Sequence, residues 1–328
     1  MKIIITGGAG FIGSHLAEFL INKGHKIVII DNLSTGRLAN INGFKAKIKF
    51  VKADISKFGE WTKNFKNAEV VFHLAALADI VPSIQNPKKY FQSNVVGTEN
   101  VASASIKFGI KKIIYSASSS CYGIPKKYPT PESESIKPQY PYAMTKNLGE
   151  QILLHYAKIY GVQVTSLRLF NVYGTRSRTS GTYGAMFGVF LAQKLKNKLL
   201  TVVGDGKQKR DFTYISDVIY GFSKALKVKK NFQIFNLGTG KPIAVNKIVK
   251  LLNCKSIKIP KRPGEPDITC ANINKIKKEL NWKPKINIEL GIKKILKEIN
   301  YWKNAPVWTP KKIKLATKDW FKYLKWWY

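Results

Sequence analysis

Apolar and polar residues alternate along the first half of the chain in two repeating patterns. Short, almost continuous apolar runs predict buried β-strands, and between them apolar residues recur at helical spacing. The predicted strands are Lys2–Thr6, Lys26–Asp31, Ile48–Val51, Val70–Leu74, Ile113–Ser116 and Val164–Leu169. The predicted helices are Phe11–Lys23, Tyr90–Phe108 and Tyr142–Tyr160, and a glycine follows each of them. This alternation predicts an α/β fold built on a doubly wound parallel sheet.

The pattern changes after about residue 170, where loops and shorter helices punctuated by Gly and Pro replace the regular alternation. We therefore expect residues 1–170 to form the sheet domain and residues 171–328 to form mainly a smaller C-terminal domain. Asp211–Leu226 and Phe232–Leu237 again have the patterns of a helix and a strand. Segments near residues 211–237 are accordingly expected to return to the sheet.

The composition indicates a globular chain that works in a reducing compartment. A length of 328 residues with 45% hydrophobic residues allows a large buried core. Cys121, Cys254 and Cys270 include no close pair, so we expect neither a disulfide framework nor a metal site. The chain starts without the features of a signal peptide, and no stretch is long enough for a transmembrane helix. We therefore expect a cytoplasmic protein.

The formal net charge of +37 raises the question of a polyanionic partner. Nearly all of the cations are Lys residues spread along the chain, whereas nucleic-acid-binding proteins cluster their charge and favour Arg. Only six Arg residues occur: Arg37, Arg168, Arg176, Arg178, Arg210 and Arg262. We therefore expect no nucleic-acid partner, although the charge would attract a doubly anionic small molecule.

A glycine-rich turn, Gly7-Gly8-Ala9-Gly10-Phe11-Ile12-Gly13, follows the first predicted strand and opens the first predicted helix. Glycines in such a turn permit a tight bend and let a pyrophosphate approach the helix N-terminus. The second predicted strand ends at Asp31, whose carboxylate can accept hydrogen bonds from adenosine ribose hydroxyls. This combination predicts a Rossmann site for a dinucleotide. NAD is favoured over NADP because Asp31 would repel a 2′-phosphate, although Arg37 lies close enough to soften this preference.

Candidate catalytic groups occur where Tyr142 and Lys146 lie four residues apart on one face of a predicted helix. A nearby ammonium stabilises a phenolate, so Lys146 is expected to lower the pKa of Tyr142 and make it a base for a substrate hydroxyl. The same spacing recurs at Tyr122/Lys126 and Tyr220/Lys224, but Gly123 and Pro125 oppose a helix at the first pair. The Tyr220 pair lies on a later helix without an adjacent polar strand end. Tyr142 follows a strand that ends in the serine run of residues 116–120, at the edge where ligands bind in such folds.

Taken together, these motifs resemble the extended short-chain dehydrogenase/reductase family, and in particular its nucleotide-sugar epimerases and dehydratases. The resemblance covers nearly the full length. It includes the glycine turn and Asp31, His73–Ala76, Asn94, the serine run before Tyr122-Gly123, Tyr142/Lys146, Arg168–Asn171, Asn236–Gly240 and Arg262–Glu265.

By this resemblance Ser118, Tyr142 and Lys146 would form the catalytic set, and Lys146 would also hold the nicotinamide ribose. The residues expected to bind NAD are Gly7, Gly10, Phe11, Ile12, Gly13, Asp31, Asn32, Ser34, Gly36, Asp54, Ile55, Leu74, Ala75, Ala76, Asn94, Ser116, Tyr142, Lys146 and Phe170. The residues expected to bind the nucleotide-sugar are Ser83, Ser118, Ser119, Tyr142, Asn171, Arg210, Arg262, Glu265 and Thr269. Guanidinium groups suit this last role because they match pyrophosphate oxygens in bidentate geometry. The resemblance also implies a homodimer formed through helices beside the sheet.

Reactions in this family begin alike, with a base taking the C4 hydroxyl proton while hydride passes from C4 to NAD. A 4,6-dehydratase then needs an Asp-Glu pair after the catalytic hydroxyl residue, where this chain has Ser119 and Ser120. The decarboxylases usually carry Glu where Ser120 stands. We therefore expect a 4-epimerase of a UDP-hexose, with dehydration or UDP-glucuronate decarboxylation or epimerisation as the alternative. In the 4-epimerases that this chain resembles, a side chain just before an Ala-Asn/Asp pair limits the space beside the 2-substituent, and Thr269 aligns with it. Because Thr is small where a bulky Tyr would exclude an N-acetyl group, the resemblance implies that UDP-N-acetylglucosamine is accepted as well as UDP-glucose.

Two further hypotheses belong to other functional classes. The fold could bind NAD as a sensor or structural subunit, which the intact Ser118, Tyr142 and Lys146 disfavour. Residues 316–328 mix aromatic and basic side chains, a combination found in helices that lie on anionic membranes. We favour instead that these aromatic residues pack against the body of the protein or against a dimer partner.

Overall fold

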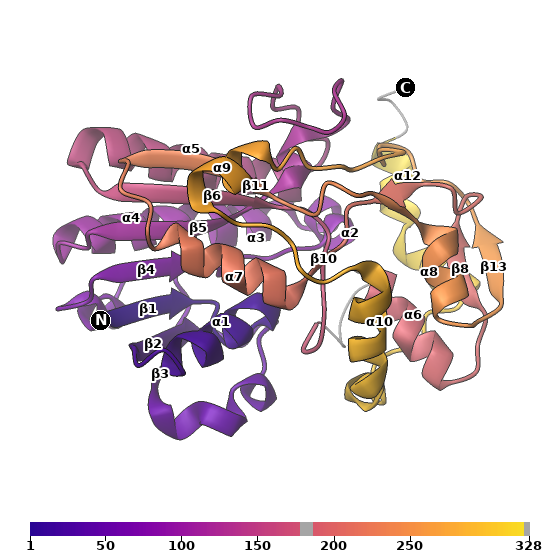
Figure 1. Cartoon of the computed structure of the whole chain (residues 1–328), viewed down its shortest axis with the longest axis horizontal. Helices are drawn as coiled ribbons and strands as arrows, with labels where there is room; N and C mark the ends of the chain where they lie inside the picture. The colour runs from indigo at the N-terminus through magenta and orange to yellow at the C-terminus, as the bar shows by residue number, and fades with distance from the viewer. Residues whose placement is uncertain (178–185, 325–328) are drawn as a thin grey trace.

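The computed structural model describes residues 1–177 and 186–324 and contains a seven-stranded parallel sheet (Figure 1). Every neighbouring pair in the sheet is parallel, which confirms the predicted doubly wound α/β fold. The order is β11 (Phe232–Leu237), β6 (Gln163–Leu169), β5 (Lys112–Ser118), β4 (Val70–His73), β1 (Lys2–Thr6), β2 (Lys26–Asp31) and β3 (Ile48–Lys52). The strand order reverses between β1 and β4, the position where such sheets form a ligand crevice.

The central strands are largely apolar on both sides because helices cover both faces of the sheet. On β1, Ile3 and Ile5 belong to one hydrophobic core, together with Leu16 of helix α1 (Phe11–Ile21). Ile4 points the other way into a second core that contains Leu153. Helix α7 (Ile215–Ala225) packs beside α1 on the first face. On the second face lie α4 (Gly97–Lys107) and α5 (Pro141–Tyr160).

The helix predicted over Tyr90–Phe108 is present in three consecutive pieces. It starts with α3 (Pro87–Phe91), passes through a π-helical turn at Gln92–Val96 and continues as α4. A π turn inserts an extra residue into the helical ladder, which changes the direction of the side chains there, and such turns are frequent at functional sites. Asn94 lies in this turn.

The rest of the chain forms a smaller group of elements at one side of the sheet, on the right of Figure 1. Its pairs are β8 (Leu200–Val203) with β13 (Ser256–Ile259), β9 (Lys209–Arg210) with β12 (Ile243–Ala244), and β7 (Val172–Tyr173) with β10 (Thr213–Tyr214). Its helices are α6 (Met186–Leu195), α8 (Val245–Leu251), α10 (Ile288–Lys297), α11 (Pro310–Ala316) and α12 (Lys318–Tyr323). The short helices α2 (Ile80–Gln85) and α9 (Asn274–Leu280) complete the fold. The division of labour between residues 1–170 and 171–328 stays a prediction.

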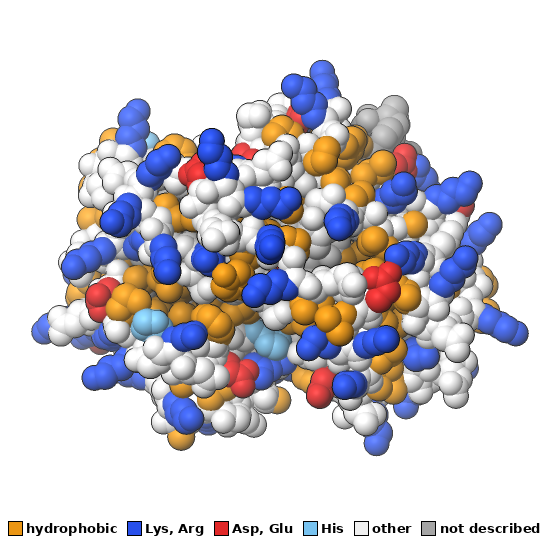
Figure 2. Space-filling view, viewed as in Figure 1, with side chains coloured by type: hydrophobic (Ala, Val, Ile, Leu, Met, Phe, Trp, Pro, Cys, Tyr) orange, Lys and Arg blue, Asp and Glu red, His pale blue; other side chains and the backbone are white. Residues whose placement is uncertain are grey.

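The surface carries the excess of basic residues in dispersed form. Figure 2 shows Lys and Arg side chains scattered over the visible face, with few acidic side chains between them. Within the described ranges, no helix combines the length and the apolar character that are needed to cross a bilayer.

Candidate functional site

A cavity of about 600 Å³ lies at the carboxyl ends of the strands, where the sheet meets the smaller group of elements. Its wall includes Ser118 at the end of β5, Tyr142 and Lys146 of α5, and Arg210 and Arg262 from the second half of the chain. A smaller hollow of about 420 Å³ adjoins it and shares Arg210 and Glu265. The structure therefore brings the predicted catalytic groups and the predicted anion-binding groups into one space.

The glycine turn forms a cradle that requires glycine at its two most closely packed positions, Gly7 and Gly13. Gly7 has a φ of 71°, and a Cβ there would lie 2.6 Å from the backbone nitrogen of Ala75. A Cβ at Gly13 would overlap the carbonyl oxygen of Gly7 and the Cα of Gly8. Helix α1 begins at Phe11, and its N-cap Gly10 makes no side-chain capping hydrogen bond. The first N–H groups of this helix are thus directed at an open turn, which suits a pyrophosphate.

Asp31 is buried at the end of β2, directly beside this cradle. One carboxylate oxygen accepts a hydrogen bond from the Ala9 N–H at 2.9 Å, and the other accepts one from the Leu33 N–H at 2.8 Å. Burial raises the pKa of Asp31, and these two bonds oppose the rise. A Cβ at Gly36 would lie 2.8 Å from the Asp31 carboxylate, so glycine keeps the space beside it open. Each oxygen retains a lone pair for a ribose hydroxyl.

The other residues expected to bind NAD lie at three places. Phe11, Ile12, Leu74, Ala76, Ser116 and Phe170 line the cavity. Beyond β2, Asn32 accepts a hydrogen bond from the Ser34 N–H and contacts Asp54, while Ile55 is buried beneath Gly97. Asn94 is buried behind the cavity wall, where its amide group bonds both backbone groups of Leu77 and the Thr145 hydroxyl. Asn94 therefore ties the loop after β4 to helix α5.

The predicted catalytic groups adjoin one another at the start of α5. Ser118 hydrogen-bonds Tyr142, and the Ser118 and Ser120 hydroxyl oxygens are 2.8 Å apart. Burial raises the pKa of Tyr142 more than the bond from Ser118 lowers it. The expected lowering by Lys146 is therefore not the dominant effect in this structure.

Lys146 is almost fully buried, with its ammonium 4.1 Å from the centroid of the Tyr115 ring. Burial lowers its pKa to about 7, and the charge of Glu150 opposes that change. The proton on this ammonium is consequently labile near neutral pH, unlike that of a surface lysine.

A buried polar network behind Lys146 was not foreseen from the sequence. Arg168 of β6 and Glu150 of α5 form an ion pair of 2.6 Å, with side chains that are 3% and 2% exposed. Ser166 donates to the same carboxylate at 2.6 Å, and Arg168 donates to the Tyr122 hydroxyl at 2.9 Å. The position of Glu150 one helical turn after Lys146 is the signal that could have identified it.

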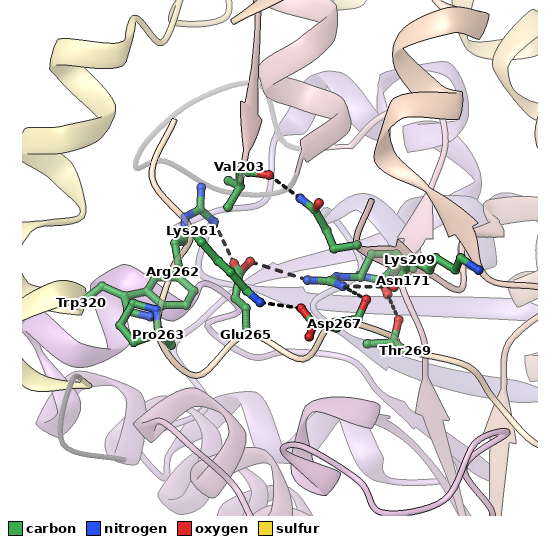
Figure 3. Close-up of polar contacts among 12 residues, drawn as sticks. Asn171, Val203, Lys209, Lys261, Arg262, Pro263, Glu265, Asp267, Thr269 and Trp320 are labelled. Carbon is green, nitrogen blue, oxygen red and sulfur yellow. Dashed lines mark hydrogen bonds and ion pairs between the residues drawn. The ribbon is translucent and has the colours of Figure 1, made fainter. Parts of the chain in front are cut away.

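At the far end of the cavity, two guanidinium groups converge on one carboxylate (Figure 3). Arg262 bonds Glu265 at 2.9 Å, and Arg210 lies 3.6 Å from the other oxygen of Glu265. Arg210 pairs with Glu265, and the neighbouring Asp211 has a different set of partners. Asp211 accepts hydrogen bonds from the backbone N–H groups of Thr239, Gly240 and Ala271 and so holds two loops together.

Thr269 and Asn171 also face this end of the cavity. The Thr269 hydroxyl donates to the Asn171 side-chain oxygen at 3.0 Å (Figure 3). The same hydroxyl accepts a hydrogen bond from the Asp211 N–H at 3.2 Å. Ser119 lines the cavity, and its predicted contact with the nucleotide-sugar stays a prediction. Ser83 does not line it, because this buried side chain donates to the Ile80 carbonyl within α2.

The C-terminal segment is described as far as residue 324. Trp320 and Leu324 are buried against the body, as favoured above for residues 316–328, whereas Tyr323 is 52% exposed. Residues 325–328 of this segment and Arg178 lie outside the described residues.

Comparison with known proteins gives a consistent result. Residues 3–238 match the NAD dependent epimerase/dehydratase family. A putative UDP-glucose 4-epimerase of Methanocaldococcus jannaschii is 38% identical over 309 residues, covering 92% of this chain and 98% of that protein. A UDP-glucuronate 4-epimerase of Thermodesulfobacterium geofontis is 35% identical, with 89% and 94% covered. The crystal structure of a Thermotoga maritima UDP-glucose 4-epimerase with UDP-glucose has a TM-score of 0.86 at 33% identity, with 93% and 99% covered.

Proposed function

Since the chain belongs to the NAD-dependent epimerase/dehydratase family of the extended short-chain dehydrogenases/reductases, we propose that it inverts C4 of a UDP-hexose. NAD is its cofactor, and the glycine cradle with Asp31 fits this dinucleotide. The observation that carries the proposal is the shared cavity. It joins a Ser118–Tyr142–Lys146 group, suited to proton transfer, to two guanidinium groups suited to a diphosphate.

In the proposed mechanism, bound NAD supplies the acceptor and later the donor of the hydride at C4. The Tyr142 phenolate removes the proton from the C4 hydroxyl, and Ser118 holds the sugar oxygen by a hydrogen bond. The charge of Lys146 stabilises the phenolate. After the 4-keto sugar has rotated to present its opposite face, Tyr142 returns the same proton to the C4 oxygen. No atom is gained or lost in the overall reaction.

The residues after Ser118 favour this reaction over elimination. Dehydration requires a base for the C5 proton and an acid for the leaving oxygen at C6. Ser119 and Ser120 occupy the positions where such carboxylates would stand, and the Ser120 hydroxyl is bonded to Ser118. A serine hydroxyl is too weak an acid and base for either task without an activating partner.

We propose further that N-acetylhexosamine substrates are accepted. Thr269 occupies little volume on the cavity wall, and its hydroxyl is turned toward Asn171. Thr269→Tyr would fill the space beside the 2-substituent, so activity on UDP-N-acetylglucosamine should fall while activity on UDP-glucose persists. Unchanged activity on the N-acetyl sugar would remove Thr269 from this role.

A UDP-uronate is the second candidate substrate, because a relative with 35% identity is named a UDP-glucuronate 4-epimerase. A uronate carries a carboxylate at C6 and calls for a cation near that end of the sugar. Among the described wall residues the cations are Lys146, Arg210 and Arg262, and the two arginines share Glu265. The described residues therefore favour a neutral hexose.

One experiment tests the reaction and the substrate together. Purified protein is incubated with UDP-glucose, UDP-N-acetylglucosamine and UDP-glucuronate without added NAD, and the products are identified by NMR. We expect the 4-epimer of each accepted sugar, with no loss of water or carbon dioxide. Tyr142→Phe should abolish turnover but retain NAD, whereas the matched Tyr220→Phe should have little effect. Full turnover by Tyr142→Phe would refute the mechanism and return the sensor hypothesis to consideration.

A homodimer remains part of the proposal. The outer face of α5 carries Met144, Leu148, Ile152 and Ile159 at helical spacing, and Met144 and Ile159 are 44% and 57% exposed. An exposed apolar stripe of this kind is typical of a helical interface. Light scattering should give twice the chain mass, and Ile159→Glu should shift it toward the monomer.

A further inference from the structure

Helix α12 brings an aromatic residue from the end of the chain to the cavity wall. Trp320 is 2% exposed, and its indole N–H donates to the Pro263 carbonyl at 2.7 Å. It belongs to neither of the two large cores of the fold. It packs instead with Val81 and Leu324 in a small separate cluster over α2. This position sets Trp320 apart from tryptophans that serve the main core.

The groups around Trp320 belong to the substrate end of the cavity. The Arg262 guanidinium lies 5.3 Å from the centroid of the indole ring, on the loop that also carries Glu265 (Figure 3). On another side, the Tyr140 ring lies 6.4 Å from Trp320 and is stacked 6.4 Å from the ring of Tyr142. All five side chains line the same cavity. Trp320 therefore contacts both Arg262, which is predicted to bind the diphosphate, and Tyr140, which stacks on the predicted catalytic residue Tyr142.

We propose that Trp320 is a positioning residue of the nucleoside-diphosphate site, which extends the proposed function to the C-terminal helix. Arg262 is held by the Glu265 carboxylate and by the indole face, so fewer of its rotamers are open before the ligand arrives. A guanidinium fixed in advance loses less entropy when it binds a diphosphate. The indole is itself held in place by its hydrogen bond to the carbonyl of Pro263, the residue that follows Arg262.

The alternative is that Trp320 only stabilises the fold, and ligand chemistry separates the two roles. A residue that acts through Arg262 affects ligands in proportion to the phosphate that they offer. Binding of UDP should then depend on Trp320 strongly, binding of UMP less, and binding of uridine and NAD hardly at all. A purely structural residue would change all four affinities together, along with the melting temperature.

The test uses Trp320→Phe and Trp320→Ala in the full chain, with Trp302→Phe as the matched control. Trp302 is 1% exposed, belongs to the large core and is absent from the cavity wall. Calorimetry with UDP, UMP, uridine and NAD gives the affinities, and thermal melting gives the stability. We expect Trp320→Ala to weaken UDP binding roughly 2- to 30-fold, the range for a cation–π contact. Trp320→Phe should weaken UDP binding by a smaller factor. Trp302→Phe should lower the melting temperature while UDP affinity stays unchanged.

Unchanged UDP affinity in a folded Trp320→Phe and Trp320→Ala would overturn the inference, as would equal weakening of all four ligands. Arg262→Lys combined with Trp320→Phe gives a second readout, because residues that act together should lose less in combination than the two separate losses added. The inference and the proposed function can fail separately. A protein that binds UDP through Trp320 but leaves C4 of every tested sugar unchanged would refute only the proposed function.

Discussion

Replacing Glu150 by Gln tests the buried network behind the catalytic lysine. The change keeps the shape of the side chain but removes the charge that Arg168 faces at 2.6 Å, with both side chains almost fully buried. The remaining Arg168 charge would be left uncompensated among Tyr122 and Ser166. Removing one partner of such a pair costs about 3–5 kcal/mol of folding free energy. We therefore expect Glu150→Gln to lower the free energy of unfolding by about that amount.

The same substitution should also change the pH dependence of turnover. Burial lowers the pKa of Lys146 to about 7, and the charge of Glu150 is the opposing influence. Without that charge, Lys146 should lose its proton at a lower pH. If the charged lysine supports the Tyr142 phenolate, the decline of activity on the alkaline side should move to lower pH in Glu150→Gln.

Urea unfolding and a pH–rate profile measure these two effects on the same set of variants. The controls are Arg168→Met and the double variant Glu150→Met/Arg168→Met. Glu150→Gln and Arg168→Met should each lower the free energy of unfolding strongly. The double variant should recover most of it, because a well-packed apolar pair can replace a buried ion pair. A Glu150→Gln protein as stable as the wild type, or an alkaline limb that moves upward, would refute the reasoning.

Three further predictions concern the cofactor site. Gly13→Ala should abolish NAD retention, because its Cβ would overlap the Gly7 carbonyl, whereas Gly43→Ala, in open space, should retain NAD; released nucleotide measures both. Asp31→Asn should weaken NAD binding roughly 10- to 100-fold in a titration, the range for a hydrogen bond to a charged group. In NAD-free protein, the lowered pKa of Lys146 costs stability fully below about pH 7 and progressively less up to pH 10.5. Relative to Lys146→Met, the free energy of unfolding of the wild type should therefore rise with pH across this window, at up to about 1.4 kcal/mol per pH unit. Urea unfolding at several pH values measures it, and the same pH dependence in both proteins would contradict this.

The sheet was largely predictable because parallel strands buried on both faces leave a plain apolar signature. β1 and β2 have the predicted bounds, and β3 differs by one residue. The helix predicted from Tyr142 begins one residue earlier, at Pro141, which suits the first turn of a helix. The π turn at Gln92–Val96 escaped prediction because apolar spacing does not register one inserted residue. The pairing of β8 with β13 joins segments far apart in the sequence, which no local pattern encodes.

The site divides in the same way between local and distant contributions. The glycine cradle and the Tyr142/Lys146 pair lie within short segments, so their spacing alone indicates their chemistry. Trp320 contacts Tyr140, which lies more than half of the chain length before it in the sequence, and residue type gave no hint of that contact. Asn94 and Ser83 are residues of the predicted site that the structure places outside the described cavity wall. The family resemblance implies that both bind ligands directly, which stays a prediction; in the structure their side chains bond neighbouring protein groups.

If the proposed function holds, the different placement of Lys and Arg accounts for selective binding of a small anion by a chain of charge +37. Lysines dispersed over the surface attract an anion from a distance, and salt screens that attraction beyond about 8 Å at physiological ionic strength (Figure 2). The described cations on the cavity wall are instead Arg210, Arg262 and the buried Lys146, and Glu265 holds both arginines. Added salt should therefore slow the association of a nucleotide-sugar more than it speeds its release. Under the proposed function, selection among anions would rest with these two guanidinium groups, which among the described cations of the cavity wall are the ones that offer a planar fork to a diphosphate.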